Sequence, residues 1–181
     1  MKKILFVIGS TRKGSFNRQL ADEAAKLLEG KAEVSELDFS DLPFVNQDTE
    51  FPALPAVQRV RDEVAAADGV WVFSPEYNYS YPGYVKNLLD WLSRPTVEGD
   101  YGSAVAAGAK VTVSNAAGRS AGAGCRAKLF ELAKAIRMVP MEEAAAGVVL
   151  KPESWQTGRL VLDDADREQL ARQAEAFLSF V

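Results

Sequence analysis

Short apolar runs alternate with amphipathic stretches along almost the whole chain, and this alternation restricts the fold more than any other feature. The apolar or β-rich runs predict strands at residues 3–8, 33–37, 70–73, 110–114 and 138–141. Apolar residues at helical spacing predict helices at residues 16–28, 56–67, 124–137 and 163–180, and one more that begins at Pro82. Strands that alternate with helices form a parallel sheet with right-handed crossovers. The sequence therefore predicts an α/β fold with a five-stranded parallel sheet.

Three segments outside these elements are rich in proline, glycine or alanine. Residues 41–55, 95–109 and 151–158 are therefore expected to be loops. The segment 95–109 is expected to be an excursion between a helix and the fourth strand. The length of 181 residues fits one domain, so residues 1–181 are predicted to form a single domain.

Composition argues against several partners and locations. The net charge of −4 gives no indication of a nucleic-acid partner, which would favour a basic face. The N-terminal apolar run covers only residues 4–9, too few for a signal peptide, and no stretch approaches the ~20 apolar residues of a membrane span. Cys125 is the only cysteine, so no internal disulfide can form and a cytoplasmic location is expected.

The chain contains no histidine, and this absence excludes much of the usual catalytic chemistry. Nucleophile systems of the Ser-His-Asp and Cys-His kinds are excluded, and so is zinc held by histidine. A single cysteine also excludes iron–sulfur clusters and zinc sites made of cysteines. An enzyme of this composition is therefore expected to rely on a bound organic cofactor.

The segment after the first predicted strand, residues 9–17 (the first loop), is dense in hydroxyl groups and glycine and leads into a helix. A helix N-terminus offers free N–H groups and a partial positive charge, which suit a phosphate, and Arg12 can add a charge-assisted contact. The segment has neither G-x-x-x-x-G-K-[ST] nor G-x-G-x-x-G, so it is neither a P-loop nor a dinucleotide fingerprint. Without those glycines, Asp38 is interpreted as a surface residue. The alternative is that Ser15 or Asn17 only caps the helix.

Residues 74–82 (the second loop) contain three tyrosines and two prolines after a buried strand. Aromatic side chains held by prolines form a stiff wall for a planar ring system, and Glu76 and Asn78 can orient such a ring. The alternative is a proline-rich turn that covers the sheet edge. Exposed Tyr77, Tyr79 and Tyr81, with the region of Trp91, would present enough aromatic surface to favour a homodimer.

Residues 114–124 (the third loop) are rich in glycine and alanine, so their backbone can approach a ligand closely. Cys125 follows at a predicted helix start, where a thiol pKa would fall, although a small packed residue is the preferred interpretation. The tryptophans Trp71, Trp91 and Trp155 are interpreted as core or interface residues. The three loops follow strands whose carboxyl ends would meet at one edge of the sheet, where ligands bind in such folds.

The motifs GSTRKGSFNR, at residues 9–18, and SPEYNYSYPGYVKNLLDW, at residues 74–91, resemble the NADPH-dependent FMN reductase family. That family includes bacterial quinone, chromate and azo-compound reductases, and the likeness covers about residues 3–180. The resemblance implies a flavodoxin-like three-layer sandwich with strand order 2-1-3-4-5. It also implies noncovalently bound flavin mononucleotide (FMN), NADPH or NADH as co-substrate, and a homodimer or homotetramer.

The family's cofactor contacts can be carried over by position. The residues implied are Ser10, Arg12, Ser15, Phe16 and Asn17 at the phosphate, Pro75, Glu76, Tyr77 and Asn78 beside the ring and ribityl chain, and Ser114, Asn115 and Gly118 at the pyrimidine edge. Two departures stand out. Ala116 and Ala117 replace residues that are commonly hydroxylated, and segment 95–109 is longer than usual.

The sequence is compatible with three functions. The leading hypothesis is an oxidoreductase in which reduced nicotinamide gives hydride to FMN and a quinone, a flavin or another small acceptor receives the electrons. The second is a flavodoxin-type carrier between protein partners, but such carriers are usually more acidic than a net charge of −4. The third is a receiver-type regulatory domain, which would need acidic residues after the first strand, where this chain has Gly9-Ser-Thr.

Overall fold

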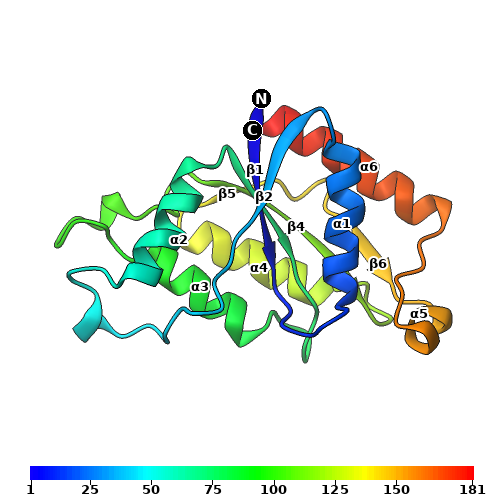
Figure 1. Ribbon diagram of the computed structural model, residues 1–181, viewed down its shortest axis with the longest axis horizontal. Helices are drawn as coiled ribbons and strands as arrows, with labels where there is room; N and C mark the ends of the chain where they lie inside the picture. The colour runs from blue at the N-terminus through cyan, green and yellow to red at the C-terminus, as the bar shows by residue number, and fades with distance from the viewer.

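The computed structural model describes all 181 residues, and its centre is a parallel sheet with helices on both faces (Figure 1). The strands are β1 (Lys2–Ile8), β2 (Ala32–Glu36), β3 (Gly69–Phe73), β4 (Lys110–Ala117), β5 (Val139–Pro140) and β6 (Gly147–Val149). Their order is β2-β1-β3-β4-β5, every pair is parallel, and β6 also pairs with β4. The predicted strand order 2-1-3-4-5 is confirmed.

Six α-helices form the outer layers of the sandwich. They are α1 (Phe16–Leu28), α2 (Pro55–Ala66), α3 (Gly83–Ser93), α4 (Ala123–Ala135), α5 (Pro152–Thr157) and α6 (Asp164–Phe180). Figure 1 shows α1 and α6 on one side of the sheet, with α2, α3 and α4 on the other. None of these helices combines the length and the apolar character that a membrane crossing requires.

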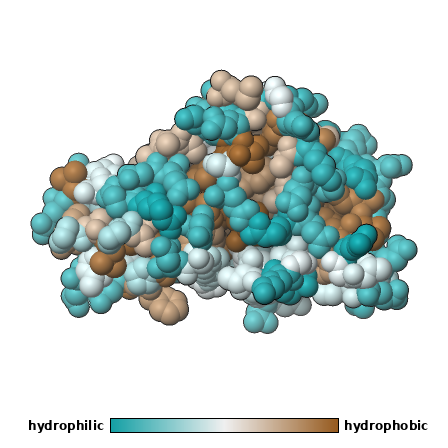
Figure 2. Space-filling view, in the orientation of Figure 1, coloured by the Kyte–Doolittle hydropathy of each residue, from teal (hydrophilic) through white to brown (hydrophobic).

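The two faces of β1 explain why its residues 4–8 are all apolar. Ile4, Phe6 and Ile8 belong to the core that includes α1 and α6 residues, whereas Leu5 and Val7 belong to the core under α2, α3 and α4. A strand covered on both faces must be apolar at every position. Burial of each large apolar side chain contributes about 1.5–3 kcal/mol, so this central strand anchors both layers. In contrast, the outer face of the molecule in Figure 2 is largely hydrophilic, with scattered apolar patches.

The edge beyond β4 differs from the prediction. A single fifth strand was expected at residues 138–141, but two short strands pair with β4: β5 beside Lys110 and Val111, and β6 beside residues 115–117. The buried Gln173 of α6 fills the break between them. Its Oε1 accepts hydrogen bonds from Ser114 Oγ (2.7 Å) and Ala146 N (2.8 Å), and its Nε2 donates to Thr112 Oγ1 (2.8 Å). Side-chain hydrogen bonds thus replace strand pairing at that point.

The segment 151–158 was expected to be a loop but contains α5. Pro152 occupies the first turn, and Gly158 ends the helix with a φ of 70°. Proline at the start and left-handed glycine at the end are both ordinary helix signals. The prediction was wrong because the helix has only six residues and no apolar stripe.

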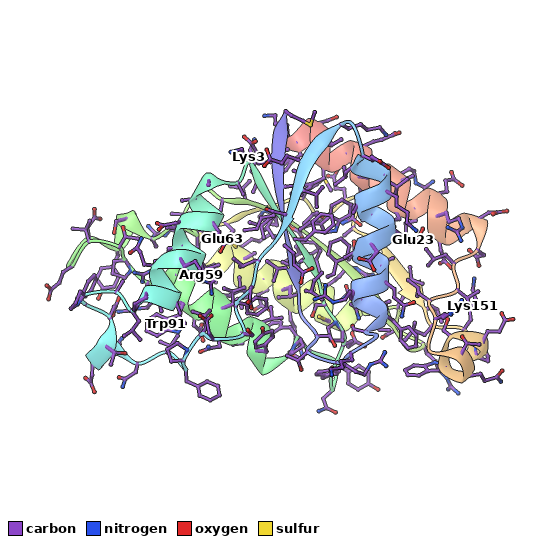
Figure 3. All side chains as sticks on the ribbon, in the orientation of Figure 1. Lys3, Glu23, Arg59, Glu63, Trp91 and Lys151 are labelled. Atoms are coloured by element: carbon purple, nitrogen blue, oxygen red, sulfur yellow. The ribbon has the colours of Figure 1, made fainter.

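Two long loops, residues 41–54 and 95–109, are attached to α3. Glu50 accepts two hydrogen bonds from Arg94, at 3.0 and 2.8 Å. The buried Trp91 donates from its Nε1 to the Pro43 carbonyl at 2.8 Å (Figure 3). Trp91 is therefore a core residue, and the expectation that its region exposes aromatic surface was wrong.

Candidate functional site

An open cavity of about 220 Å³ lies at the carboxyl ends of β1, β3 and β4. The chain order of the strands reverses between β1 and β3, which is where ligands bind in open α/β sheets. The lining residues are Ser10, Arg12, Ser15, Phe16 and Asn17 from the first loop and the start of α1, Pro75, Glu76 and Tyr77 from the second loop, Ala116, Ala117 and Gly118 at the end of β4, and Leu150 and Trp155 beyond β6. The residues predicted from sequence thus converge here, except for Asn78, Ser114 and Asn115.

The first loop presents free hydrogen-bond donors at the start of α1. Ser15 caps the helix, because its Oγ accepts from Asn17 N at 3.2 Å. The N–H groups of Phe16 and Arg18, also in the first turn, donate to no protein acceptor. The Arg12 guanidinium lies 4.9 Å from the centre of the Phe16 ring, and its Nη2 donates to the Gly14 carbonyl at 3.0 Å. Ser15 therefore does cap the helix, and the uncapped donors with the nearby cation form a place for an anion.

Asn17 ties this helix to the end of β4. Its Oδ1 accepts from Ala116 N at 2.8 Å, and its Nδ2 donates to the Ala116 carbonyl at 3.0 Å. The side-chain amide thus pairs with the strand as a neighbouring peptide would, and Asn17 is only 2% exposed. These two bonds occupy one donor and one acceptor of the amide, so the side chain holds two parts of the site together.

The second loop forms a tight turn. Tyr77 and Ser80 exchange backbone hydrogen bonds of 2.9 and 3.0 Å, and Asn78 and Tyr79 between them have positive φ angles of 52° and 59°. Asparagine adopts this conformation readily, but tyrosine rarely does. Asn78 lies at the tip of the turn and does not line the cavity. Tyr77 and Tyr79 are exposed as predicted, whereas Tyr81 is half-buried, so its predicted exposure was wrong.

Glu76 joins the second loop to the N-terminus of α4. Its carboxylate accepts hydrogen bonds from Ser120 Oγ and from Cys125 N, the latter at 2.8 Å. Burial by itself would raise the pKa of Glu76, but the hydrogen bonds from Ser120, Cys125 and Gly124 and the charge of Arg126 lower it below its ordinary value. The carboxylate is thus held ionised, where the helix dipole also favours a negative charge.

Ser114 and Asn115 both lie within β4, which ends at Ala117, three residues beyond the predicted end at Ser114. Ser114 Oγ donates to Gln173 and accepts from Trp71 Nε1 at 2.8 Å. Asn115 Nδ2 donates to the Ser74 carbonyl at 2.6 Å, and its Oδ1 accepts from Arg126 Nη1 at 3.2 Å. Both side chains are fully buried and hydrogen-bonded inside the protein. They hold the end of β4 beside the second loop and α4.

Cys125 is fully buried at the start of α4, and its Sγ donates to Ser74 Oγ at 3.4 Å. Burial raises the pKa of the thiol, and this effect exceeds that of its hydrogen bonds. A neutral buried thiol is a poor nucleophile. The structure therefore agrees with the interpretation of Cys125 as a small packed residue.

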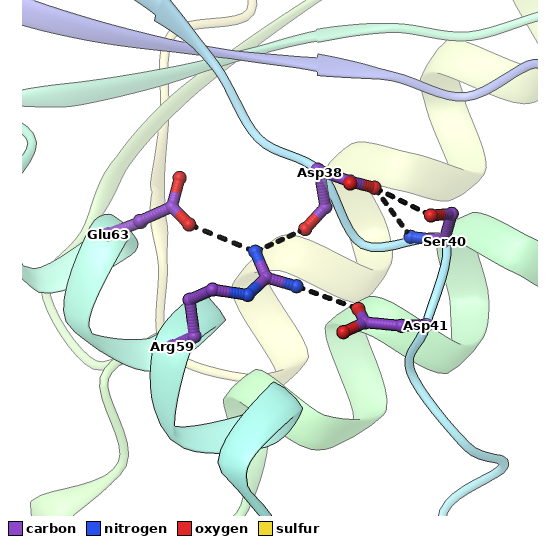
Figure 4. Close-up of polar contacts among 5 residues, drawn as sticks. All are labelled: Asp38, Ser40, Asp41, Arg59 and Glu63. Carbon is purple, nitrogen blue, oxygen red and sulfur yellow. Dashed lines mark hydrogen bonds and ion pairs between the residues drawn. The ribbon is translucent and has the colours of Figure 1, made fainter.

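A second groove of about 370 Å³ lies beyond the first loop and shares Ser10 and Arg12 with the cavity. Its wall at the end of β2 is held by Arg59, which donates to the Asp38 carbonyl (2.6 Å), Asp41 (2.7 Å) and Glu63 (3.0 Å), as Figure 4 shows. The Asp38 carboxylate accepts from the backbone N–H and hydroxyl of Ser40. Asp38 is exposed and engaged in its own turn, in agreement with its interpretation as a surface residue.

Glu76 generates a prediction about acid stability. Because the folded protein lowers its pKa below 4.5, the ionised carboxylate stabilises the fold above that pH, and this contribution is lost as the pH falls through the folded value. We expect Glu76→Gln to lower the melting temperature near neutral pH and the difference from wild type to shrink below pH 4.5. Thermal unfolding at several pH values measures this.

Glu98→Gln is the matched control, because Glu98 is exposed and makes no side-chain hydrogen bond or ion pair. It should leave the melting temperature almost unchanged at every pH. A Glu76→Gln difference that stays constant between neutral and acidic pH would show that the carboxylate charge does not hold these loops.

Comparisons with known proteins agree with this arrangement. The model of the family described as NADPH-dependent FMN reductase matches residues 2–151. A quinone reductase of Escherichia coli is 33% identical, over 99% of this chain and 95% of the relative. An NAD(P)H-dependent FMN reductase of Pseudomonas aeruginosa is 31% identical with the same coverage. The solved structure of FerB, a flavoenzyme NAD(P)H:(acceptor) oxidoreductase from Paracoccus denitrificans, superimposes with a TM-score of 0.86 at 31% identity, over 99% of this chain and 96% of that one. The chain belongs to the NADPH-dependent FMN reductase family.

Proposed function

We propose that this protein is an FMN-dependent oxidoreductase that passes electrons from NADPH or NADH to a quinone, a flavin or another small acceptor. We further propose that residues 1–181 act as one FMN-binding domain. The observation that carries the proposal is the cavity at the strand-order reversal, where the free donors at the start of α1 and the side chain of Arg12 face the second loop. The relatives named quinone reductase and FMN reductase, which match almost the whole chain, support the same activity.

The cavity fits FMN in its chemistry. We place the phosphate at the first loop, against Ser10, Arg12, Ser15 and the free N–H groups of Phe16 and Arg18. We place the flavin ring against Pro75, Glu76 and Tyr77, with Gly118 at its edge. Asn17, Asn78, Ser114 and Asn115 are proposed to position the walls, since their side chains bond to protein groups or lie outside the cavity.

When bound, FMN supplies the redox chemistry by taking up a hydride equivalent from the reduced nicotinamide and passing two electrons to the acceptor. The protein has no histidine and its only cysteine is buried, so its side chains bind and orient without forming covalent intermediates. The second and third loops would hold the ring, and Glu76 keeps these loops together through its hydrogen bonds to Ser120 and Cys125. A flavodoxin-type electron carrier is the alternative, but neither the relatives nor the mild net charge of −4 favours it.

We also propose that the protein works in the cytoplasm as a homodimer or homotetramer. Tyr77 and Tyr79 beside the cavity are 53% and 74% exposed, and an aromatic surface of this kind favours a partner subunit. Sedimentation at micromolar protein should give at least the dimer mass, and Tyr79→Ala should shift the equilibrium toward the monomer. A wild-type monomer at that concentration would contradict the proposal. Recovery of the protein outside the cytoplasmic fraction would contradict its location.

The proposed phosphate contact gives a prediction for Arg12. A hydrogen bond to a charged group contributes about 1.5–3 kcal/mol, so Arg12→Ala should weaken FMN binding roughly 10- to 100-fold. Riboflavin has no phosphate and should bind wild type and variant equally. Titration of the apoprotein by flavin fluorescence measures both. Lys13→Ala removes the same charge outside the cavity and should weaken FMN binding less than Arg12→Ala does. Equal losses for FMN and riboflavin would mean that Arg12 only shapes the loop.

The proposed reaction gives a prediction for steady-state kinetics. If nicotinamide and quinone use the same cavity, as we propose, they bind in turn, and double-reciprocal plots at several quinone concentrations should be parallel. Cys125→Ser should retain most of the activity, because the thiol is buried and has no role in the reaction. Intersecting lines would mean that both substrates bind together and that the acceptor uses another surface.

A further inference from the structure

Trp155 is the one tryptophan that the core does not enclose. Trp71 and Trp91 are at most 1% exposed, whereas Trp155 is 63% exposed. Its side chain lines the cavity together with the first and second loops. Its ring meets the Phe16 ring edge-on, with centres 5.4 Å apart and an interplanar angle of 84°. An exposed indole is thus placed beside the first turn of α1, where the free donors lie.

The segment that carries Trp155 is firmly attached. Gln19 of α1 donates to the Gly158 carbonyl at 3.0 Å and accepts from Leu160 N at 2.7 Å. The buried Ser154 accepts from Val161 N at 3.0 Å. Lys151, labelled beside α5 in Figure 3, forms ion pairs with Asp163 (2.8 Å) and Asp166 (3.2 Å). The position of the indole is therefore set by the fold, since both ends of α5 are tied to longer helices.

Trp155 lies outside the motifs that carry the family resemblance. The family model matches residues 2–151, so α5 and Trp155 lie beyond the matched part of the chain. The indole of Trp155 adds an apolar face to a cavity whose first loop is polar and cationic. The indole carries no charge, and its one polar group is the Nε1–H, so most of its surface can act on a ligand only through apolar contact and steric exclusion.

We propose that Trp155 is a specificity-determining residue that closes the phosphate end of the cavity and selects a flavin mononucleotide over a flavin dinucleotide. The proposal rests on the function proposed above, because it takes the phosphate to lie at the start of α1. Any group attached beyond that phosphate would meet the indole, which packs on Phe16 of the same turn. The adenylate of FAD is such a group, whereas FMN ends at the phosphate.

The test compares FMN, FAD and riboflavin binding to the apoprotein by fluorescence titration. Trp155→Ala should lower the ratio of the FAD and FMN dissociation constants about tenfold. FAD should bind more tightly because the indole no longer blocks its adenylate. FMN should bind about threefold to tenfold more weakly because an aromatic contact is lost. Trp155→Phe should give an intermediate ratio. Phe44→Ala, which removes an aromatic side chain that is 86% exposed and outside the cavity, is the control and should leave the ratio unchanged.

A second readout does not depend on affinity. Protein labelled with 5-fluorotryptophan should give three fluorine NMR signals, and the signal missing in Trp155→Phe identifies Trp155. Adding FMN should move this signal more than those of Trp71 and Trp91. If wild type takes up FMN but neither the preference nor the Trp155 signal changes, the inference about Trp155 is wrong and the proposed function stands. If wild type takes up no FMN, the proposed function fails and the inference fails with it.

Discussion

The hydrogen bonds between the Asn17 amide and the Ala116 backbone, at 2.8 and 3.0 Å, join parts of the site that lie 99 residues apart in the chain. Glu76 makes the equivalent connection between the second loop and α4. Each loop has hydrogen bonds of its own, such as the pair between Tyr77 and Ser80, but these do not fix one loop relative to another. Buried, fully hydrogen-bonded side chains are rigid connections in a low-dielectric interior. The shape of the cavity thus depends on two polar side chains, Asn17 between α1 and β4 and Glu76 between the second loop and α4.

This arrangement suits an enzyme whose reactive group is a cofactor. No side chain in the cavity has to exchange a proton or form a bond, so the polar residues are free to serve as fixed contacts. Glu76 is held ionised by its hydrogen bonds, and Cys125 is buried and neutral. In the proposed function, the protein would hold the flavin ring and the phosphate of FMN at fixed positions, which requires stiff loops. In the proposed arrangement, Arg12 and the Phe16–Trp155 pair would serve the same purpose at the phosphate end.

Much of this structure is predictable from the sequence, because the information is local. The apolar periodicity of β1 and α1 and the loops at the carboxyl ends of the strands locate the cavity. The motif around Asn17 indicates a phosphate site, but nothing local shows that its amide is bonded to Ala116. The strand β6 has three residues and α5 has six, so neither has enough length for a periodic signal. Trp155 and Leu150 reach the site only through tertiary packing, which a single sequence does not reveal. The same holds for Trp91, whose indole is buried under residues 41–54.

A reductase of the proposed kind reacts directly with reduced nicotinamide, without another reductase. Anaerobic stopped-flow mixing of the FMN-loaded protein with NADH or NADPH alone tests it most directly. The oxidised flavin absorbance should disappear rapidly with at least one of the two nicotinamides. The same absorbance should return when a quinone is added. If neither nicotinamide bleaches the flavin within minutes, the protein is an electron carrier that needs a partner reductase, and the account is contradicted.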